Sequence, residues 1–453
     1  MAVQNNRLTA EEYEQRFSDI HPPFETRDAA LVDANRCLFC YDAPCTKSCP
    51  TGINVPKFIK QITTDNLKGA AYTIFSSNIM GGGCAKVCPV EKLCEGACVY
   101  NLMEETAIPI ARLQRYATEP AIKGQWRMFE RKQRTGKKVA IIGAGPAGLS
   151  CAHALSREGV DVTIYEKEAK GGGLMTYGIA AYKVTPAFCE EEVSFITGIG
   201  GIDIRYNQEL GKDILLSALQ EEYDAVYLAF GVGLARQLYI PGEQLEGVVD
   251  AISFIYDIRN SGFPAVPVGD QVAVIGMGMT AIDAATQARR LGAKEVTLVY
   301  RRTQQEMPCT VAEMDIALLD GCKIIWLAAP AEIIGENGKA TQLICHSVRL
   351  EEDNTGRRQP VLTDEKIVLP VDMVIKAAGQ MPFEQLIYEN QLHHNGGKIA
   401  VTGNGVTSIN GVFAGGDCVN GGKEVVDAVQ AGKEGAAAIL AYLQADCHVS
   451  SSH

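Results

Sequence analysis

The spacing of apolar residues divides the chain into two regions of different texture. Residues 1 to about 125 show helix-like spacing of apolar positions, as in the stretch from Val55 to Ser76. From Val139 nearly to the end, short apolar strands alternate with helical segments, which is typical of a parallel sheet covered by helices. The charged segment from Lys123 to Lys138 separates the two regions and is interpreted as a linker.

The second region repeats itself. The stretches VAIIGAGPAGLSCAHALSREGVDVTIYEK, from Val139, and VAVIGMGMTAIDAATQARRLGAKEVTLVYRR, from Val272, each predict a strand, a glycine turn, a helix and a second strand. A shorter echo relates YDAVYLAFG at 223–231 to VDMVIKAAG at 371–379. A buried strand that ends in small residues is a natural crossing point between domains. We therefore expect the chain to leave one nucleotide-binding domain after the first copy and to return after the second.

These patterns predict an α/β protein with three parts. A helical domain is expected over 1–125, followed by a first Rossmann-like domain over 137–264 and 373–453. A second Rossmann-like domain, over 265–372, is expected to be nested in the first.

The first glycine fingerprint consists of Gly143, Gly145 and Gly148, directly after the strand from Val139. In such a fingerprint the first glycine makes a tight turn, the second lets the backbone approach a pyrophosphate, and the third lets helix and strand pack closely. Glu166 ends the next strand, at the position of a ribose-binding carboxylate. Strand, glycines, helix and acid are all in register, which favours a bound dinucleotide over a tight turn without a ligand.

The second fingerprint has Gly276, Gly278 and Ala281, and alanine is tolerated at the third place. Alignment of the strands puts Tyr300 opposite the acid of the first copy, followed by Arg301 and Arg302. Guanidinium groups form forked bonds to phosphate, so this pair favours NADPH. The alternative is a pair of solvated arginines at the end of a strand.

Near the C-terminus, GVFAGGDCVNGG predicts a strand that runs into Gly415, Gly416 and Asp417, and then a helix near Lys423. A short acid behind a turn of small residues can accept a hydrogen bond from a ribityl hydroxyl, and the helix start can face a charged part of the same cofactor. Considered alone, the segment would be an ordinary Gly-Asp turn.

The first hundred residues hold eight cysteines in two runs, C-x2-C-x4-C-x3-C-P and C-x3-C-P-x4-C-x3-C. Thiolate sulfur stabilises iron–sulfur clusters, and four ligands hold one [4Fe–4S] cluster. The rival interpretation is two structural zinc sites, although cysteine–proline pairs inside such runs suit iron–sulfur clusters better. The cysteines of the two runs are Cys37, Cys40, Cys45 and Cys49, and Cys84, Cys88, Cys94 and Cys98.

Composition restricts the setting of this chemistry. A net charge of −12 argues against nucleic acid as a main partner. Fifteen cysteines without a signal peptide or an apolar membrane span indicate a reducing, cytoplasmic location. The seven cysteines outside the two runs are scattered, and neither nucleotide domain contains C-x-x-C, so a disulfide reductase of this fold is disfavoured and no catalytic side chain is named.

Residues 37–115, 139–183, 272–308 and 411–435 together resemble the electron-entry half of dihydropyrimidine dehydrogenase, which is a separate small subunit in many bacteria. The small subunit of glutamate synthase is similar. The most specific stretches are CLFCYDAPCTKSCPTGI, GGGCAKVCPVEKLCEGACVYN and ARLQRYATE, and the last two are closer to dihydropyrimidine dehydrogenase.

The resemblance implies a ligand set for two [4Fe–4S] clusters. One cluster would take Cys37, Cys40, Cys45 and Cys98, and the other would take Cys49, Cys88, Cys94 and Gln114. Cys84 would then be a bystander, although spacing alone includes it.

For FAD, the resemblance implies a set of contact residues. These are Gly143, Gly145, Pro146, Ala147, Gly148, Glu166, Lys167, Gly173, Leu174 and Asp417. Lys183 stands where the family has an arginine that contacts phosphate, so charge is kept but the forked geometry is lost.

The activity implied is that of an oxidoreductase subunit. NAD(P)H would be oxidised, and electrons would pass through FAD and two [4Fe–4S] clusters to an FMN-containing partner that reduces uracil or thymine in pyrimidine catabolism, within a hetero-oligomer such as a heterotetramer. Bacterial members commonly use NADH, so the nicotinamide is left as NAD(P)H. The alternatives are a glutamate synthase small subunit or other NAD(P)H:ferredoxin-type oxidoreductase, and, from another class, a non-enzymatic scaffold stapled by zinc.

Overall fold

The chain folds as two units, seen in a computed structural model that describes residues 3–450. The larger unit comprises His21–Thr176, Lys183–Leu234 and the chain from Met381 onward. The smaller unit comprises the chain up to Ile20, Tyr177–Tyr182 and Ala235–Gln380. The nested arrangement expected from the repeat is thereby confirmed, because one unit interrupts the other along the chain.

The first part of the larger unit is helical, as its apolar spacing predicts. Asn54 and Asn66 cap the helices α4 and α5, each by accepting a backbone N–H three residues on. Apolar side chains from α4, such as Phe58 and Ile59, pack with Leu113 of α7 in one core. The helices are α2 (Arg27–Asn35), α3 (Pro44–Lys47), α4 (Val55–Thr63), α5 (Leu67–Ser77), α6 (Gly81–Val87), the 3-10 helix η1 (Val99–Met103) and α7 (Ile110–Lys123).

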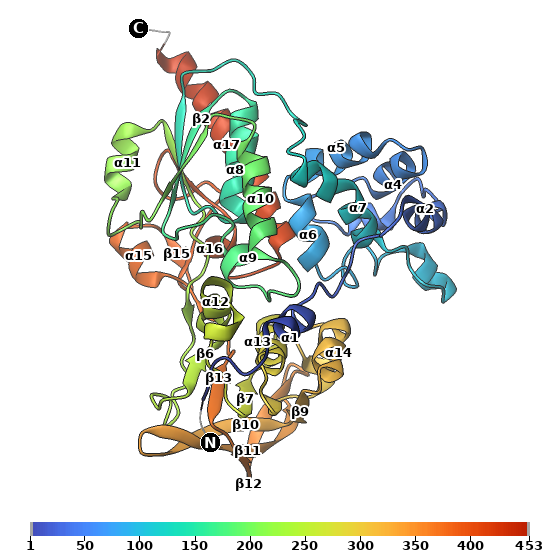
Figure 1. The fold of residues 1–453 in the computed structure, drawn as a ribbon. Helices are drawn as coiled ribbons and strands as arrows, with labels where there is room; N and C mark the ends of the chain where they lie inside the picture. The colour runs from blue at the N-terminus through green and yellow to red at the C-terminus, as the bar shows by residue number, and fades with distance from the viewer. Residues whose placement is uncertain (1–2, 451–453) are drawn as a thin grey trace. The chain divides into compact units, whose positions relative to one another are not determined.

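The remainder of the larger unit is built on a parallel sheet with strand order β17-β4-β1-β2-β3. Figure 1 shows α8, α10 and α17 together on one side of this sheet and α11 on the other. The strands are β1 (Lys138–Ile142), β2 (Asp161–Glu166), β3 (Ile202–Tyr206), β4 (Ala225–Leu228) and β17 (Val412–Ala414). The helices are α8 (Pro146–Arg157), α9 (Leu174–Tyr177), α10 (Pro186–Thr197), α11 (Leu216–Glu222), α15 (Glu384–Glu389), α16 (Asp417–Asn420) and α17 (Val425–Ser450), and β15 (His394–Asn395) and β16 (Lys398–Ile399) form a small ribbon. Throughout residues 3–450, each helix is too short or too polar to cross a membrane.

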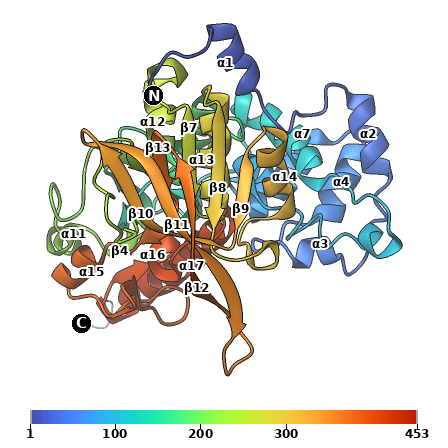
Figure 2. The same ribbon diagram turned by 90° about the horizontal axis from the view of Figure 1, so that it is seen from below.

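The smaller unit has its own five-stranded parallel sheet, with order β6-β13-β7-β8-β9. A second sheet, β10-β11-β12, is antiparallel and includes the long β11–β12 hairpin seen in Figure 2. The strands are β6 (Val248–Asp250), β7 (Gln271–Ile275), β8 (Glu295–Tyr300), β9 (Lys323–Trp326), β10 (Ala328–Glu336), β11 (Lys339–Glu352), β12 (Arg358–Pro370) and β13 (Met373–Lys376). The helices are α1 (Ala10–Arg16), α12 (Ala251–Ser261), η2 (Phe263–Ala265), α13 (Met279–Arg290), η3 (Gln304–Glu306) and α14 (Val311–Leu319).

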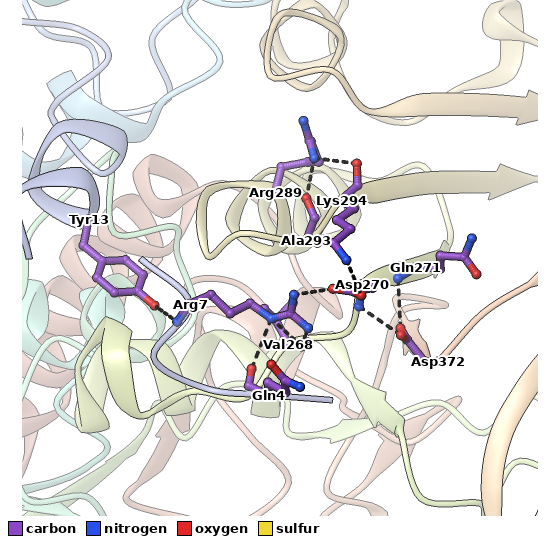
Figure 3. Close-up of polar contacts among 10 residues, drawn as sticks. All are labelled: Gln4, Arg7, Tyr13, Val268, Asp270, Gln271, Arg289, Ala293, Lys294 and Asp372. Atoms are coloured by element: carbon purple, nitrogen blue, oxygen red, sulfur yellow. Dashed lines mark hydrogen bonds and ion pairs between the residues drawn. The ribbon is translucent and has the colours of Figure 1, made fainter. Parts of the chain in front are cut away.

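The shorter echo in the sequence has a structural cause in each sheet. The aspartates of YDAVYLAFG and VDMVIKAAG each bind backbone N–H groups where the neighbouring central strand begins. Asp224 accepts the N–H of Lys138 at 2.7 Å, at the start of β1. Asp372 accepts the N–H groups of Asp270 and Gln271 at 3.0 and 2.9 Å, at the start of β7 (Figure 3). The echo therefore marks the strand that pairs with the glycine-fingerprint strand in each unit.

The smaller unit extends from Ala235 to Gln380 and is longer than the segment 265–372 expected from the repeat. Strand β6 pairs in parallel with β13, with Val248 opposite Val374, and α12 packs on the same sheet. A three-residue strand followed by a helix carries no glycine signature, so the sequence pattern did not separate it from the first domain. Strands β5 (Leu234–Ala235) and β14 (Gln380–Met381) lie at the two crossing points of the chain.

The N-terminal segment belongs to the smaller unit and not to the cysteine-bearing helices, where the expected 1–125 domain placed it. Arg7 forms an ion pair with Asp270 and donates to the carbonyl of Val268 at 2.8 Å (Figure 3). The ring of Phe17 stacks on Phe263 with centroids 3.9 Å apart. These are contacts between residues about 250 positions apart, so local spacing could not reveal them.

We expect Arg7→Ala to lower the free energy of unfolding of the smaller unit by about 2 kcal/mol, because charge-assisted hydrogen bonds to buried groups contribute that much. The Arg7 side chain is only 11% exposed, so its partners would be left desolvated. Urea unfolding followed by fluorescence measures the change. Arg16→Ala is the control, since Arg16 is exposed and makes one long bond of 3.5 Å; a loss as large in this variant would refute the assignment.

Candidate functional site

The first glycine fingerprint forms a turn that admits only glycine at its first position. Gly143 has φ of +102°, and a Cβ there would lie 2.5 Å from the carbonyl oxygen of Ala229. A Cβ on Gly148 would lie 2.0 Å from the carbonyl oxygen of Gly143. Helix α8 begins after Gly145 with Pro146 in its first turn, and its N-terminus receives no side-chain cap from any residue in the described range. Uncapped N–H groups at a helix start suit a pyrophosphate.

Glu166 lies at the end of β2 and contacts the fingerprint directly. Its carboxylate accepts the N–H of Ala144 at 2.7 Å and that of Glu168 at 2.9 Å. Burial raises the pKa of Glu166, and the two N–H donors act in the opposite direction. Each carboxylate oxygen has a further lone pair, so the group can also accept bonds from ribose hydroxyls.

The C-terminal Gly-Asp turn meets the same helix start. A Cβ on Gly416, which has φ of +77°, would lie 2.9 Å from the Cβ of Ala147. Asp417 begins α16 and accepts the N–H of Lys423 at 3.1 Å, while burial raises its pKa. Segments 270 residues apart in the sequence are thus brought together, as one dinucleotide site requires.

Of the remaining expected FAD residues, Gly173 and Leu174 lie close to this turn. A Cβ on Gly173 would lie 2.8 Å from the Cα of Gly145, and Leu174 begins α9 directly after it. Lys167 follows Glu166 and places its ammonium over the ring of Phe383. Lys183 is buried, with 7% exposure.

The second fingerprint repeats the geometry of the first in the smaller unit. Gly276 has φ of +135°, and a Cβ there would lie 2.4 Å from the carbonyl oxygen of Ala377. Helix α13 starts directly after Gly278, where the described residues supply no side-chain cap, and Ala281 is fully buried in its first turn. The turn therefore fits a second pyrophosphate.

The two arginines after β8 are not equivalent. Arg302 donates to the carbonyl of Arg358 at 2.8 Å and lies 3.4 Å from Gln359, so it holds the β12 strand. Arg301 is exposed and makes no ion pair with another described residue. Of the expected pair, Arg301 is the one whose side chain is exposed, and Arg302 is partly buried.

Four cysteines line a small apolar pocket, which we call the first cysteine site: Cys37, Cys40, Cys45 and Cys98. The other walls are apolar and include Val55, Ile59 and Ile108. Burial and the neighbouring Cys37 raise the pKa of Cys45 to about 11. A metal must therefore displace the proton, and the soft sulfurs in an apolar shell fit an iron–sulfur cluster.

The second cysteine site comprises Cys49, Cys88 and Cys94, whose thiols influence one another electrostatically. Gln114 on α7 reaches the start of α6 and donates its amide N–H to the carbonyl of Gly81 at 2.6 Å, so its side chain is buried against the helix that precedes Cys88. The backbone N–H of Cys88 donates to the carbonyl of Cys84 at 3.0 Å, and the Cys84 thiol acts to raise the pKa of Cys88, so Cys84 lies next to this site. That contact follows from their i, i+4 spacing, with Cys88 directly after the end of α6.

The sulfurs of the first cysteine site are arranged around a pocket with apolar walls. Soft thiolate donors in an apolar shell suit an inorganic iron–sulfur cluster. Among residues 3–450, no three His, Cys, Asp or Glu side chains converge closely enough to hold one metal ion.

Two charged residues that contact the cysteine-bearing helices carried no sequence signal; Glu192 is buried and Lys433 is partly buried. Lys433 on α17 donates to the carbonyl of Ser77 at 2.7 Å, and burial lowers its pKa while the nearby Cys49 acts to raise it. Glu192 on α10 is 1% exposed and accepts the N–H of Gly83 at 2.7 Å. A lone lysine in a helix and a run of three glutamates are typical of a solvated surface, so the contacts of Lys433 and Glu192 could be found only in the structure.

Comparison with known proteins agrees with this geometry. The family model for the pyridine nucleotide-disulphide oxidoreductases matches residues 137–432, and the model for dihydropyrimidine dehydrogenase domain II, 4Fe-4S cluster, matches residues 13–126. The chain is 35% identical to the NAD-dependent dihydropyrimidine dehydrogenase subunit PreT of Salmonella typhimurium, over 96% of this chain and 99% of that one. It is 34% identical to the glutamate synthase [NADPH] small chain of Escherichia coli, over 94% of each.

A solved structure shows the same fold. Mycobacterium tuberculosis FprA in complex with NADPH covers 69% of this chain and 86% of its own, with a TM-score of 0.59 and 21% identity. Since both family models describe redox proteins, the non-enzymatic zinc-stapled scaffold is wrong. The chain belongs to the pyridine nucleotide-disulphide oxidoreductase family, in the group of FAD- and 4Fe-4S-containing NAD(P)H oxidoreductase subunits that includes the dihydropyrimidine dehydrogenase subunit PreT and the glutamate synthase small chain.

Proposed function

We propose that this chain is the electron-input subunit of a two-subunit dihydropyrimidine dehydrogenase. It oxidises NAD(P)H and supplies electrons to a partner chain that reduces uracil or thymine to the 5,6-dihydropyrimidine. The observation that carries the proposal is the packing of the cysteine-bearing helices on the flavin domain within one unit, through Lys433 and Glu192. The near-complete coverage of a relative named as a dehydrogenase subunit supports the same assignment.

When bound, the flavin accepts a hydride from NAD(P)H and releases single electrons, and the clusters carry single electrons. The chain's own residues hold these groups. The turn at Gly143 and the start of α8 bind the pyrophosphate, and Glu166 binds the ribose. We assign the flavin contacts to Gly143, Gly145, Pro146, Ala147, Gly148, Glu166, Lys167, Gly173, Leu174, Lys183 and Asp417.

The cysteine ligands divide between the two sites. We assign Cys37, Cys40, Cys45 and Cys98 to one [4Fe–4S] cluster, and Cys49, Cys88, Cys94 and Gln114 to the other. Support comes from the shared pocket of the first set and from the bond that fixes the amide of Gln114 to α6. Lys433 places a positive charge near Cys49, which favours electron arrival at the second site.

The nicotinamide nucleotide binds in the smaller unit, on Gly276, Gly278 and Ala281, with Arg301 at the 2′ position of the ribose. Arg302 stabilises the segment that follows β8 by donating a hydrogen bond to the backbone carbonyl of Arg358.

We expect Arg301→Ala to raise the KM for NADPH by about tenfold, the effect of losing one charge-assisted bond to phosphate. The KM for NADH should stay unchanged, because NADH has no 2′-phosphate. Steady-state reduction of an artificial acceptor by each nucleotide measures both constants, and NADH serves as the internal control. No change for either nucleotide would assign Arg301 to solvent, and an equal rise for both would contradict a contact with the 2′-phosphate.

A second candidate is the small subunit of a glutamate synthase, which the 34% identity over nearly the whole chain favours to a similar degree. The two functions differ in the partner. Affinity purification of the tagged chain from its native extract, followed by identification of the bound subunit, separates them. A partner that reduces uracil supports the proposal, and a glutamine-cleaving partner supports the alternative.

The isolated chain gives an independent check. It should oxidise NAD(P)H with an artificial acceptor and should fail to reduce uracil until the partner is added. Robust uracil reduction by the pure chain would contradict the proposal.

A further inference from the structure

Glu192 is a buried carboxylate that fastens the cysteine-bearing helices to the flavin domain. It lies on α10, is 1% exposed, and accepts the N–H of Gly83 at 2.7 Å. Its other oxygen is buried and finds no hydrogen-bond partner among the described residues. A charged carboxylate oxygen that is buried without a hydrogen-bond donor raises the free energy of the folded protein, and protonation removes that charge.

The glycines at the start of α6 leave room for this carboxylate and for the side chains of Ile122 and Met175. A Cβ on Gly83 would lie 2.6 Å from one oxygen of Glu192, and a Cβ on Gly82 would lie 2.9 Å from the other. Cys88 of the second cysteine site follows on the same chain segment, five residues after Gly83 and about 7.5 Å along a helix axis. A charge change at that site therefore acts on Glu192 at short range through protein.

The surrounding charges leave Glu192 poised between its two forms. Lys86 on α6 bonds Glu119 at 2.7 Å, and Glu119 also bonds Arg115, so these three groups carry one net positive charge, which favours the ionised form of Glu192 and opposes the effect of its burial. Burial raises the pKa of Glu192 to about 7, although Gly83 and Lys86 act to lower it. The charged or titratable groups on the helices packed against α10 and α6 include Cys84 and Lys86 on α6, Arg112, Arg115, Tyr116, Glu119 and Lys123 on α7, Cys151, His153 and Arg157 on α8, and Asp427, Lys433, Glu434 and Tyr442 on α17.

We propose that Glu192 takes up a proton when an electron reaches the second cysteine site. The inference rests on the proposed function, since it needs a cluster held there by Cys49, Cys88, Cys94 and Gln114. In the step, the site gains one electron, and the carboxylate of Glu192 gains one proton from water to become the neutral acid. The added negative charge is compensated within the protein, and the proton returns to water when the electron moves on.

The sign of the pH effect follows from this coupling. At low pH Glu192 is protonated whether or not the site is reduced, so the reduction potential of the second cluster does not depend on pH. As pH rises through about 7, reduction must recruit the proton, and the potential falls. The equilibrium constant for reduction should fall by up to tenfold for each pH unit in that range.

Redox titration of the complete flavin- and iron-loaded chain, monitored by electron paramagnetic resonance at several pH values, tests the proposal. The wild type should show the sloping potential, and Glu192→Gln should show a flat one, equal to the low-pH value of the wild type. Glutamine keeps an oxygen for Gly83, and iron and flavin content report whether the fold is intact. Glu191→Gln, on the same helix but half exposed, should behave as the wild type.

The outcomes separate this inference from the proposed function. A wild-type potential that is constant from pH 6 to pH 9 would overturn the role of Glu192, and that result needs no variant. A slope that persists in Glu192→Gln would overturn it as well. Failure of the proposed function would appear instead as missing iron, or as clusters that NAD(P)H does not reduce.

Discussion

Gly143→Ala should lose FAD almost completely, retaining less than about one-tenth of the flavin of the wild type. The position has φ of +102°, and the new Cβ would lie 2.5 Å from a backbone oxygen of Ala229, at the end of β4. That oxygen cannot retreat unless the sheet moves, so the turn must open and the helix start of α8 must leave its place. Flavin absorbance per chain after gel filtration measures the loss.

The control for this variant is Gly200→Ala. Gly200 also has a positive φ, of +86°, but its Cβ would meet no atom of the described structure within 4 Å. This variant carries the backbone strain of about 1 kcal/mol without the collision. If both variants kept their flavin, the turn at Gly143 would not be the pyrophosphate site.

Removal of a single cysteine ligand should remove half of the bound iron, because each cysteine serves only one of the two clusters. Cys98→Ala and Cys94→Ala are each expected to lose about four of eight irons, because each removes one ligand from a different [4Fe–4S] cluster. Cys84→Ala should keep all the iron, since Gln114 is assigned as the fourth ligand of the second site. Iron and acid-labile sulfide analysis of anaerobically purified protein measures the result.

Cys151→Ala is the control for these variants, because Cys151 is fully buried in α8 and burial alone raises its pKa. The position of Cys84 one helical turn before Cys88 makes the comparison with Cys84→Ala informative. Loss of four irons in Cys84→Ala would show that Cys84, and not Gln114, is the fourth ligand of the second site. Loss of all iron in every variant would mean that the two sites are not independent.

The parts of the fold that the sequence predicts are those that depend on local sequence patterns. Strands β1 and β7 are predicted by apolar runs that end in glycine. The glycines are required there because a Cβ on Gly143 or Gly276 would collide with the backbone that follows the neighbouring strand. The nested order follows from the echo whose aspartates, Asp224 and Asp372, hold the same strand start in each unit. Each of these features occurs twice in the sequence, and the repetition allowed it to be predicted.

The parts that the sequence misses depend on single long-range contacts. Nothing near Arg7 or Phe17 indicates that they belong with Asp270 and Phe263. The division of the cysteines is similar, because spacing grouped them by run, whereas the structure brings Cys98 to the first run. Glu192 is the clearest case: its neighbours Glu190 and Glu191 are accessible to solvent, and only the packing of α10 on α6 buries it.

Addition of NAD(P)H to the pure, anaerobic chain, with low-temperature electron paramagnetic resonance as the readout, tests the central claim most directly. The account predicts that the flavin bleaches and that signals of reduced [4Fe–4S] clusters appear without any partner subunit. Flavin reduction with no cluster signal, or a chain that contains neither iron nor acid-labile sulfide, would contradict it.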